Sequence, residues 1–332
     1  MAKSPRLAAV LIVRNEEHVL ARCLRSLQGI VDEIHVHDTG STDATPTIAA
    51  EHGAKVTHGE WPNSFAVARN RALANVGPHV SWVLSIDADE EAVADPAKLR
   101  RRLANAAVDQ YVVDITNFDE DSTYTHRADR LFRPARCRWE GELHEHIVPR
   151  SRPTTAAVMP ADTLALRHTG YADADVVKVK AERNLELAQA VIDRLAAQGD
   201  AADPTETARA MYELGRSLVG ARRRQEAVDV LEMLRELFPG TPQWLLGTDF
   251  LARHLLMEGM PDATLVLVEQ MRAAGASPMY CDWVMAHAME VAGAKRIARR
   301  LMENVTELVG PAGIRYERET VERYRRHLAE VA

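Results

Sequence analysis

A run of seven apolar residues, Leu7–Val13, constrains the fold of this chain more than any other feature. The run contains no polar residue, so a strand formed from it has to be covered on both of its faces. Residues 16–27 follow, and their apolar side chains recur at the spacing of a helix. A doubly covered strand followed by a helix is the usual start of a βαβ unit, which predicts a mainly parallel sheet.

The same rhythm continues to about residue 170. Further strands are predicted at 33–37, 54–57 and 81–86, with shorter ones, parallel or antiparallel, at 111–116 and 129–132. Helices are predicted between them at 42–52 and 64–75. Strands that alternate with helices in this way predict an α/β domain over residues 1–172.

Beyond residue 172 the apolar spacing is helical almost throughout, which predicts a second, all-α domain over residues 173–332. In residues 208–239, Leu214-Gly215 is followed by Ala227, Leu231 and Pro239, at offsets similar to those of a tetratricopeptide repeat. A second, weaker copy begins near Trp244. We therefore expect a tetratricopeptide-like domain, with an irregular helical bundle as the alternative.

Composition limits the partners of the chain. Its 332 residues suffice for two domains, and 41 basic against 48 acidic residues give a net charge of −7. Such a balance makes a poor surface for nucleic acid, because phosphate contacts need clustered cations. Three widely spaced cysteines form neither a disulfide framework nor a C-x-x-C metal site. With no run long enough to span a bilayer, we expect a cytoplasmic protein, with peripheral contact to the inner membrane face as an alternative.

The strongest chemical signal is Asp87-Ala88-Asp89, directly after an apolar strand. Alternation along a strand would place Asp87 and Asp89 on the same side at its carboxyl end, where ligands of open α/β sheets bind. Two neighbouring carboxylates repel each other, and a hard cation carrying diphosphate oxygens relieves that repulsion. This predicts Mn²⁺ or Mg²⁺ as cofactor. The alternative is helix capping, but Asp95-Pro96 already supplies the next helix with a start.

Several motifs occur in an order that closely resembles the family 2 glycosyltransferases with the GT-A fold. They are Leu11-Ile12-Val13-Arg14-Asn15-Glu16-Glu17, Asp38-Thr39-Gly40-Ser41-Thr42-Asp43, Ala68-Arg69-Asn70 and Asp87-Ala88-Asp89-Glu90. Downstream blocks at 130–133, 139–145 and 168–171 match the same sub-type. The resemblance covers about residues 5–172, and helical, tetratricopeptide-like tails are common in that sub-type.

The resemblance implies a role for individual residues. It assigns the nucleotide-sugar site to Val13, Asn15, Glu16, Asp38, Ser41, Arg69, Asp87 and Ala88. It assigns the metal to Asp89 as direct ligand, with Asp87 and His168 beside it. The alternatives are helix capping for Ser41, a surface ion pair for Arg69 and a purely structural role for His168.

An inverting transfer also needs a carboxylate that deprotonates the acceptor. Glu140, Glu142 and Glu145 lie close together, and strand alternation would place Glu140 and Glu142 on one face and Glu145 on the other. We favour Glu145, beside His144, because this pair best matches the family block, and we rank Glu140 second.

The sequence thus predicts a metal-dependent enzyme that transfers a sugar, with inversion, from a nucleoside diphosphate sugar, UDP-sugar favoured, to an acceptor. The acceptor stays open among glycan, peptide, lipid and small natural product, and the helical domain is expected to bind it or to form a homodimer. Three alternatives are a catalytically degenerate scaffold, a D-x-D phosphatase and a nucleotidyltransferase. Glu91 stands where the phosphatases carry Thr or Val, and the Gly-rich, Lys-containing loop of the nucleotidyltransferases is missing.

Overall fold

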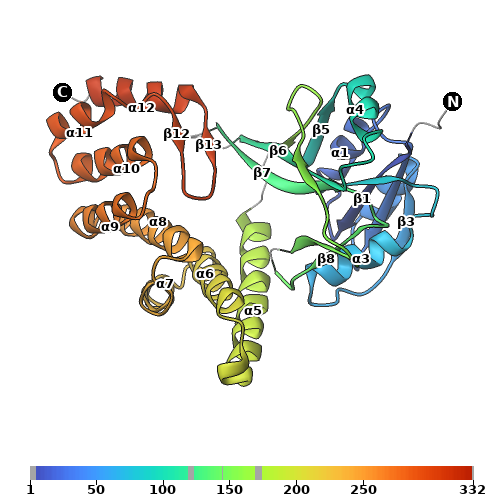
Figure 1. Ribbon diagram of the computed structural model, residues 1–332, viewed down its shortest axis with the longest axis horizontal. Coiled ribbons are helices and arrows are strands. Elements are labelled where there is room, and N and C mark those ends of the chain that lie inside the picture. The colour runs from blue at the N-terminus through green and yellow to red at the C-terminus, as the bar shows by residue number, and fades with distance from the viewer. Residues whose placement is uncertain (1–4, 119–122, 144, 169–173, 331–332) are drawn as a thin grey trace. The chain divides into compact units, whose positions relative to one another are not determined.

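The computed structural model describes residues 5–118, 123–143, 145–168 and 174–330, with side chains of the last range described from residue 181 (Figure 1). The chain divides into two compact units. The first comprises residues 1–120 and 125–171, and the second comprises residues 121–124 and 172–332.

The first unit is built on strands that are interleaved with helices. Its strands are β1 (Leu7–Val13), β2 (Glu33–Asp38), β3 (Lys55–His58), β4 (Trp82–Ser85), β5 (Glu90–Ala94), β6 (Gln110–Phe118), β7 (Thr123–Phe132), β8 (Cys137–Glu140), β9 (His146–Pro149), β10 (Ala156–Val158) and β11 (Leu164–His168). Its helices are α1 (Leu20–Ser26), α2 (Thr45–Glu51), α3 (Phe65–Ala74) and α4 (Pro96–Leu103).

The main sheet has the strand order β3-β2-β1-β4-β7-β6-β11-β5. Strands β3, β2, β1 and β4 are parallel neighbours, and β1 lies between β2 and β4. Beyond β4 the sheet becomes mixed, because β7 is antiparallel to β4 while β11 runs parallel to β6 and antiparallel to β5. The predicted mainly parallel, Rossmann-like architecture is confirmed.

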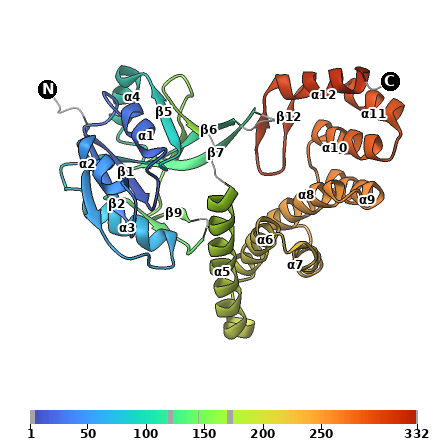
Figure 2. The same cartoon turned by 180° about the vertical axis from the view of Figure 1, so that it is seen from behind.

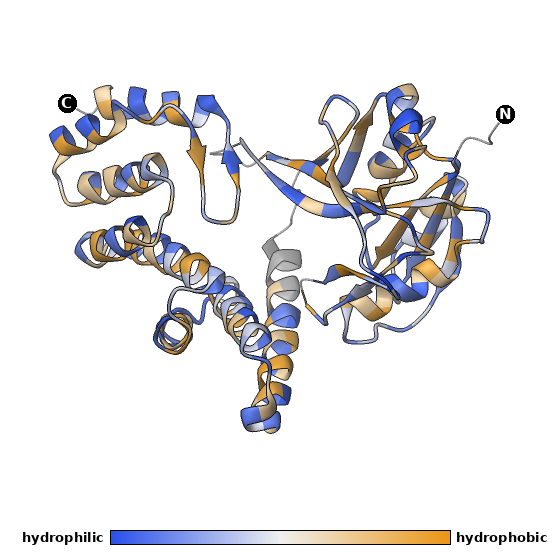
Figure 3. Ribbon diagram, viewed as in Figure 1, coloured by the Kyte–Doolittle hydropathy of each residue, from blue (hydrophilic) through white to orange (hydrophobic). Residues whose placement is uncertain are grey.

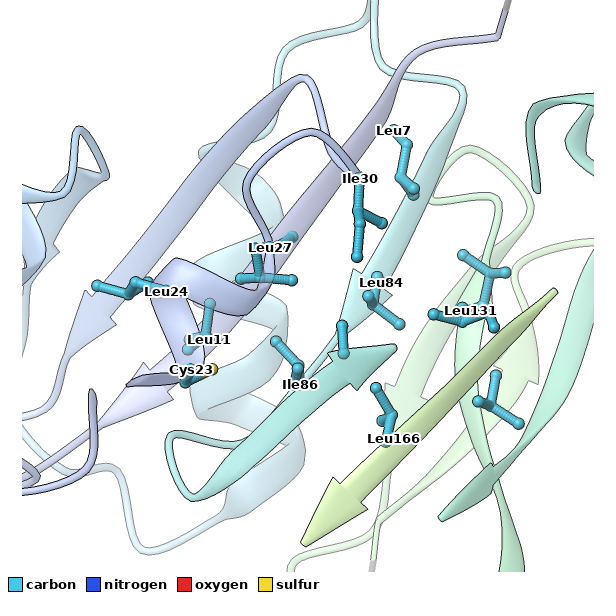
Figure 4. Packing of buried hydrophobic residues seen from close by; sticks show 14 of the residues in the cluster. Leu7, Leu11, Cys23, Leu24, Leu27, Ile30, Leu84, Ile86, Leu131 and Leu166 are labelled. Carbon is cyan, nitrogen blue, oxygen red and sulfur yellow. The ribbon is translucent and has the colours of Figure 1, made fainter. Parts of the chain in front are cut away.

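The packing of β1 explains why its sequence is apolar throughout. Leu7, Ala9, Leu11 and Val13 lie in a core cluster with Leu24 and Leu27 of α1 and with Leu84 of β4. Figure 4 shows the side chains of this cluster gathered between α1 and the sheet. The alternate residues Ala8 and Val10 belong to a second cluster, which contains residues of α3. Each face of the strand is therefore covered by a helix, as the apolar run required.

Strand β5 was not among the predicted strands, and it begins with two acidic residues, Glu90 and Glu91. The strand forms because it pairs antiparallel with β11, a partner more than 70 positions away in the chain, with Glu90 opposite His168. Pairing with a distant strand here overrides the local polar pattern.

The second unit is a series of helices. Its elements are α5 (Ala174–Gln198), the short 3₁₀ helix η1 (Gly199–Ala201), α6 (Pro204–Gly220), α7 (Arg224–Leu237), α8 (Pro242–Met257), α9 (Pro261–Ala273), α10 (Pro278–Val291), α11 (Lys295–Met302), β12 (Leu308–Val309), β13 (Arg315–Tyr316) and α12 (Arg318–Glu330). Successive pairs α6–α7, α8–α9 and α10–α11 pack as helical hairpins (Figure 2). The tetratricopeptide-like prediction is confirmed, with a short β12–β13 hairpin added.

Close packing of the first hairpin depends on Gly215. A Cβ atom at this position would lie 2.7 Å from Leu231 Cδ2, so the absence of a side chain lets α6 and α7 approach each other. The sequence indicated two repeats, whereas α10 and α11 form a third pair with the same turn. That turn carries Gly293 at φ 79°, at the position occupied by Gly259 (φ 75°) in the second pair.

Polar and apolar residues alternate along the helices of this unit (Figure 3). Among the helices that the structure describes, none is both long enough and apolar enough to cross a membrane.

Candidate functional site

The segment after β4 is a tight turn that leads directly into β5. Strand β4 ends at Ser85, the Glu90 amide donates to the Asp87 carbonyl (3.1 Å), and the Asp87 amide donates to Glu90 Oε2 (2.9 Å). Asp87 and Asp89 therefore lie in a turn and not on a strand. The expectation that alternation would direct them to the same side is wrong, and the two carboxylates have different partners.

Asp87 is held by two arginines. Its Oδ1 accepts from Arg69 Nη2 at 2.8 Å, and its Oδ2 accepts from Arg130 Nη2 at 2.7 Å. Burial opposes ionisation, but the charges of Arg130 and Arg69 outweigh it and hold the pKa of Asp87 well below its usual range. Both oxygens of Asp87 are therefore engaged by guanidinium groups, and its role as a metal ligand stays a prediction.

Arg69 connects three parts of the first unit. It is 6% exposed, which excludes the alternative of a surface ion pair. From α3 it donates to Ser85 Oγ at 3.0 Å and to Asp87, and its Nε donates to Glu145 in the connection between β8 and β9. Its guanidinium carbon also lies 5.2 Å from the centroid of the Trp139 ring, a cation–π contact.

The three candidate bases are separated by the structure. Strand β8 ends at Glu140 and β9 begins at His146, so Glu142 and Glu145 lie in the connection and strand alternation does not apply to them. The Glu140 side chain is 52% exposed and pairs with Arg138 at 2.7 Å, outside the network around Asp87. Glu145 is 11% exposed and joins that network through Arg69. His144 lies outside the described residues.

Asp89, in the same turn, pairs with His168 at the end of β11. Its Oδ2 lies 3.3 Å from His168 Nε2, and this contact raises the pKa of His168. The other ring nitrogen, Nδ1, lies 3.0 Å from Asn117 Oδ1. Thr169, Gly170 and Tyr171, which complete the motif that drew attention to His168, lie outside the described residues.

The pair brings one carboxylate and one imidazole close together. Within the part of the chain that the structure describes, no three His, Cys, Asp or Glu side chains are grouped so as to hold a metal. Oxygen and imidazole donors nevertheless fit Mn²⁺ or Mg²⁺, which commonly take their remaining ligands from water and substrate phosphates.

The loops after β1 and β2 are fastened to each other. Asn15, with φ 53°, accepts from the Thr42 amide at 2.8 Å through Oδ1, and its own amide donates to Ser41 Oγ at 2.9 Å. The Glu16 amide donates to Thr45 Oγ1 at 2.7 Å. Helix α2 has Ala44 as its N-cap, so Ser41 joins the loops and does not cap the helix.

Three other candidate residues are buried. Asp38 lies at the end of β2, where its carboxylate accepts from the Ser41 amide at 3.2 Å, and the Val13 carbonyl accepts from the Thr39 amide at 2.9 Å. Ala88 is 5% exposed, and its methyl group belongs to the core cluster. The side chain of Ala88 thus packs in the core, and the assignment of this residue to the nucleotide site stays a prediction.

Sequence reasoning missed the roles of Arg130 and Asn117. Arg130 was noted within a family block but was given no task, and it bridges Asp87 and Glu90, whose Oε1 lies 2.8 Å away. Asn117 had a visible signal. On β6 the side chains of Tyr111, Val113 and Ile115 alternate into the core, and Asn117 occupies the next buried position with a polar group.

Comparisons with known proteins bear on the first unit above all. The model of glycosyl transferase family 2 matches residues 8–169. A TPR repeat-containing protein of Synechococcus elongatus is 33% identical over 177 residues, which are 51% of this chain and 43% of that protein. The SPbeta prophage-derived glycosyltransferase SunS of Bacillus subtilis is 28% identical over 243 residues, 69% of this chain and 53% of that protein. The chain thus spans about half the length of these relatives.

One solved structure with some likeness is glucosyl-3-phosphoglycerate synthase of Mycobacterium tuberculosis in complex with Mn²⁺, UDP and glucosyl-3-phosphoglycerate. It is 26% identical over 34% of this chain and 44% of that chain, with a TM-score of 0.27. So low a TM-score supports no inference, and the metal and nucleotide are features of that enzyme. The family model, the glycosyltransferase relative and the order of motifs thus agree that residues 8–169 of this chain are similar to glycosyl transferase family 2.

Proposed function

We propose that this chain is a glycosyltransferase that moves a sugar from a nucleoside diphosphate sugar to an acceptor with the help of a divalent cation. The observation that carries the proposal is the Asp89–His168 pair, 3.3 Å apart, which joins the turn after the parallel strand β4 to the end of β11 in the domain that matches family 2. Ligands of open α/β sheets bind beyond the carboxyl ends of such strands.

Asp89 and His168 would hold Mn²⁺ or Mg²⁺, which would stabilise the negative charge of the departing diphosphate. The two arginines support this assignment, because they neutralise Asp87 and leave Asp89 as the carboxylate available to the cation. The nucleoside, for which we favour uridine, would bind at the ends of β1 and β2 and at the loops that follow them, which carry Val13, Asn15, Glu16, Asp38 and Ser41.

Glu145 is the proposed base of an inverting displacement. Its carboxylate would take the proton from the acceptor hydroxyl while the hydroxyl oxygen forms a bond to the anomeric carbon and the bond from that carbon to the diphosphate breaks. Glu145 is preferred to Glu140 because it belongs to the same network as Arg69 and Asp87. The helical unit is proposed to bind the acceptor or a second copy of the chain.

The test is turnover of a panel of nucleotide sugars with Mn²⁺ or Mg²⁺, with EDTA as the metal-free condition. Loss of several kcal/mol of charge stabilisation predicts that Asp89→Asn and His168→Gln lower kcat about 10³-fold. The matched control is Glu91→Gln, which removes a charge two residues from Asp89 that pairs instead with Arg22 (3.0 Å), and it should retain activity. Full activity of Asp89→Asn, or in EDTA, would remove the cation from the proposal.

A second candidate, a catalytically degenerate scaffold, is favoured by one observation. Both oxygens of Asp87 are already engaged by arginines of the chain itself. Thermal unfolding with UDP or GDP separates the two candidates, since a ligand that binds the folded state raises the midpoint. A rise that needs Mn²⁺ supports the transferase, whereas no rise together with no turnover supports the scaffold.

A further inference from the structure

We infer that Asn117 is a positioning residue that orients His168 for cation binding, an inference that rests on the proposed role of Asp89 and His168. Neither the motifs nor the family match singles out Asn117. It lies on β6, next to β11, and the register of this parallel pair sets Asn117 beside His168.

The contact between the two side chains determines which imidazole nitrogen carries a hydrogen. Asn117 Oδ1 lies 3.0 Å from His168 Nδ1, and an amide oxygen can only accept a hydrogen bond. The hydrogen of a neutral His168 is therefore placed on Nδ1. Asp89 Oδ2, 3.3 Å from Nε2, is also an acceptor, so a cation held between the two would take the place of a hydrogen on Nε2 and meet its lone pair. This is the arrangement in which histidine ligates a metal through one nitrogen and donates from the other.

The amide of Asn117 is itself held in this orientation. Its Nδ2 lies 3.0 Å from His126 Nδ1 on β7 and 3.5 Å from the carbonyl oxygen of Ile115. The carbonyl oxygen can only accept, so the NH₂ end of the amide has to face it. Turning the amide round would oppose two oxygens at Ile115 and leave His168 without an acceptor.

Burial indicates that this polar group is there for its contacts. Asn117 is 6% exposed on the strand face that otherwise holds Tyr111, Val113 and Ile115. An apolar residue would fill that position without the cost of burying an amide. The hydrogen bonds to His126 and His168 offset this cost, and the second of them acts on a proposed metal ligand.

The experiment measures the affinity of the full chain for Mn²⁺ alone, from the electron paramagnetic resonance signal of free Mn²⁺. Loss of an outer-shell partner typically weakens metal binding about 10–100-fold, which is the effect expected for Asn117→Leu. Asn117→Asp keeps an acceptor for His168 Nδ1 and should restore the affinity. Thr116→Val is the matched control, because it removes a 3.0 Å hydrogen bond between Thr116 of β6 and Thr125 of β7 without removing a contact of His168.

Two further results keep the inference apart from the proposed function. If His168→Gln weakens Mn²⁺ binding but Asn117→Leu does not, the positioning role is wrong while the metal pair stands. If the unaltered chain does not bind Mn²⁺, or His168→Gln binds it undiminished, the metal pair itself fails and the inference falls with it. Equal losses in Asn117→Leu and Asn117→Asp, matched by equal drops in the unfolding midpoint, would indicate a structural role only.

Discussion

Asp87 and Asp89 are separated by one residue, yet their surroundings give them different tasks. Asp87 follows β4 and pairs with Arg69 of α3 and Arg130 of β7. Asp89 pairs instead with His168. The same distinction applies to the two glutamates considered as bases, one of which belongs to this network while the other lies at the surface. At the residue scale, therefore, the partner of each carboxylate decides its proposed role.

The first residue-scale prediction compares Glu145→Gln with Glu140→Gln. Removal of a general base lowers kcat about 10²–10⁴-fold, so Glu145→Gln should show such a loss with little change in the KM of the donor. Glu140→Gln, at a position that pairs with Arg138, should keep the kcat of the unaltered chain. UDP binding and thermal unfolding are measured alongside, because Glu145 also holds Arg69. A larger loss for Glu140→Gln would transfer the role of base to Glu140.

At the element scale, the helical hairpins share one turn with different residues in it. Arg222, Gly259 and Gly293 each precede the second helix of their pair by two positions and have φ values of 61°, 75° and 79°. The amide of the following residue in each turn donates to the carbonyl five positions earlier. The backbone geometry thus repeats, but the first turn holds a residue with a Cβ atom in the left-handed region.

Replacement of Arg222 by glycine should stabilise the helical unit. A left-handed backbone destabilises an L-residue by about 1–2 kcal/mol, and glycine would relieve this strain. The greater freedom of glycine in the unfolded chain offsets about 0.5–1 kcal/mol of the stabilisation. A net gain of roughly 0.5–1 kcal/mol predicts a rise of about 1–4 °C in the unfolding midpoint. Gly259→Ala adds a Cβ atom at the equivalent left-handed position of the second turn and should lower the midpoint. A lower midpoint for Arg222→Gly would contradict the strain argument.

Element prediction from the sequence succeeded where the pattern is local. The apolar run Leu7–Val13 is β1 to the residue, and Ser64 caps α3 by accepting from the Val67 amide. It failed at β5, whose acidic start becomes a strand only by pairing with β11. The third helical hairpin was also missed, although Gly293 repeats the turn position of Gly259.

At the scale of the whole molecule, a buried histidine of the helical unit makes the stability of the fold depend on pH. In the helical unit His287 stacks on Tyr324, with ring centroids 3.7 Å apart, and lies against Trp283. Burial lowers the pKa of His287 to about 4, since it outweighs the nearby charge of Glu290. The unfolded chain binds a proton at this residue below about pH 6.5, while the folded chain stays neutral until about pH 4. Stability is therefore present above pH 6.5 and is lost as the pH falls from 6.5 to 4.

His287→Phe should reduce this acid sensitivity, because phenylalanine can stack on Tyr324 but cannot bind a proton. Between pH 7 and pH 4.5 the unaltered chain should lose on the order of 2 kcal/mol more of its unfolding free energy than the variant. Urea unfolding followed by tryptophan fluorescence measures the difference, since Trp283 adjoins the site. His18→Phe, at a side chain that is 91% exposed, is the control and should leave the pH dependence unaltered. Equal acid sensitivity in all three proteins would contradict the assignment to His287.

The amino-acid sequence by itself determined the two-part architecture, because it depends on local periodicity. An apolar run that needs cover on both faces specifies a parallel sheet, and helical spacing with small residues at the turns specifies packed hairpins. The order of motifs likewise indicated the family. Tertiary structure alone decided which carboxylates are neutralised and which can meet a cation. Arg69 and Arg130 reach Asp87 from 18 and 43 positions away, and Arg69 reaches Glu145 across 76. Electrostatic partners act through space, so only the folded chain separates Asp89 from Asp87.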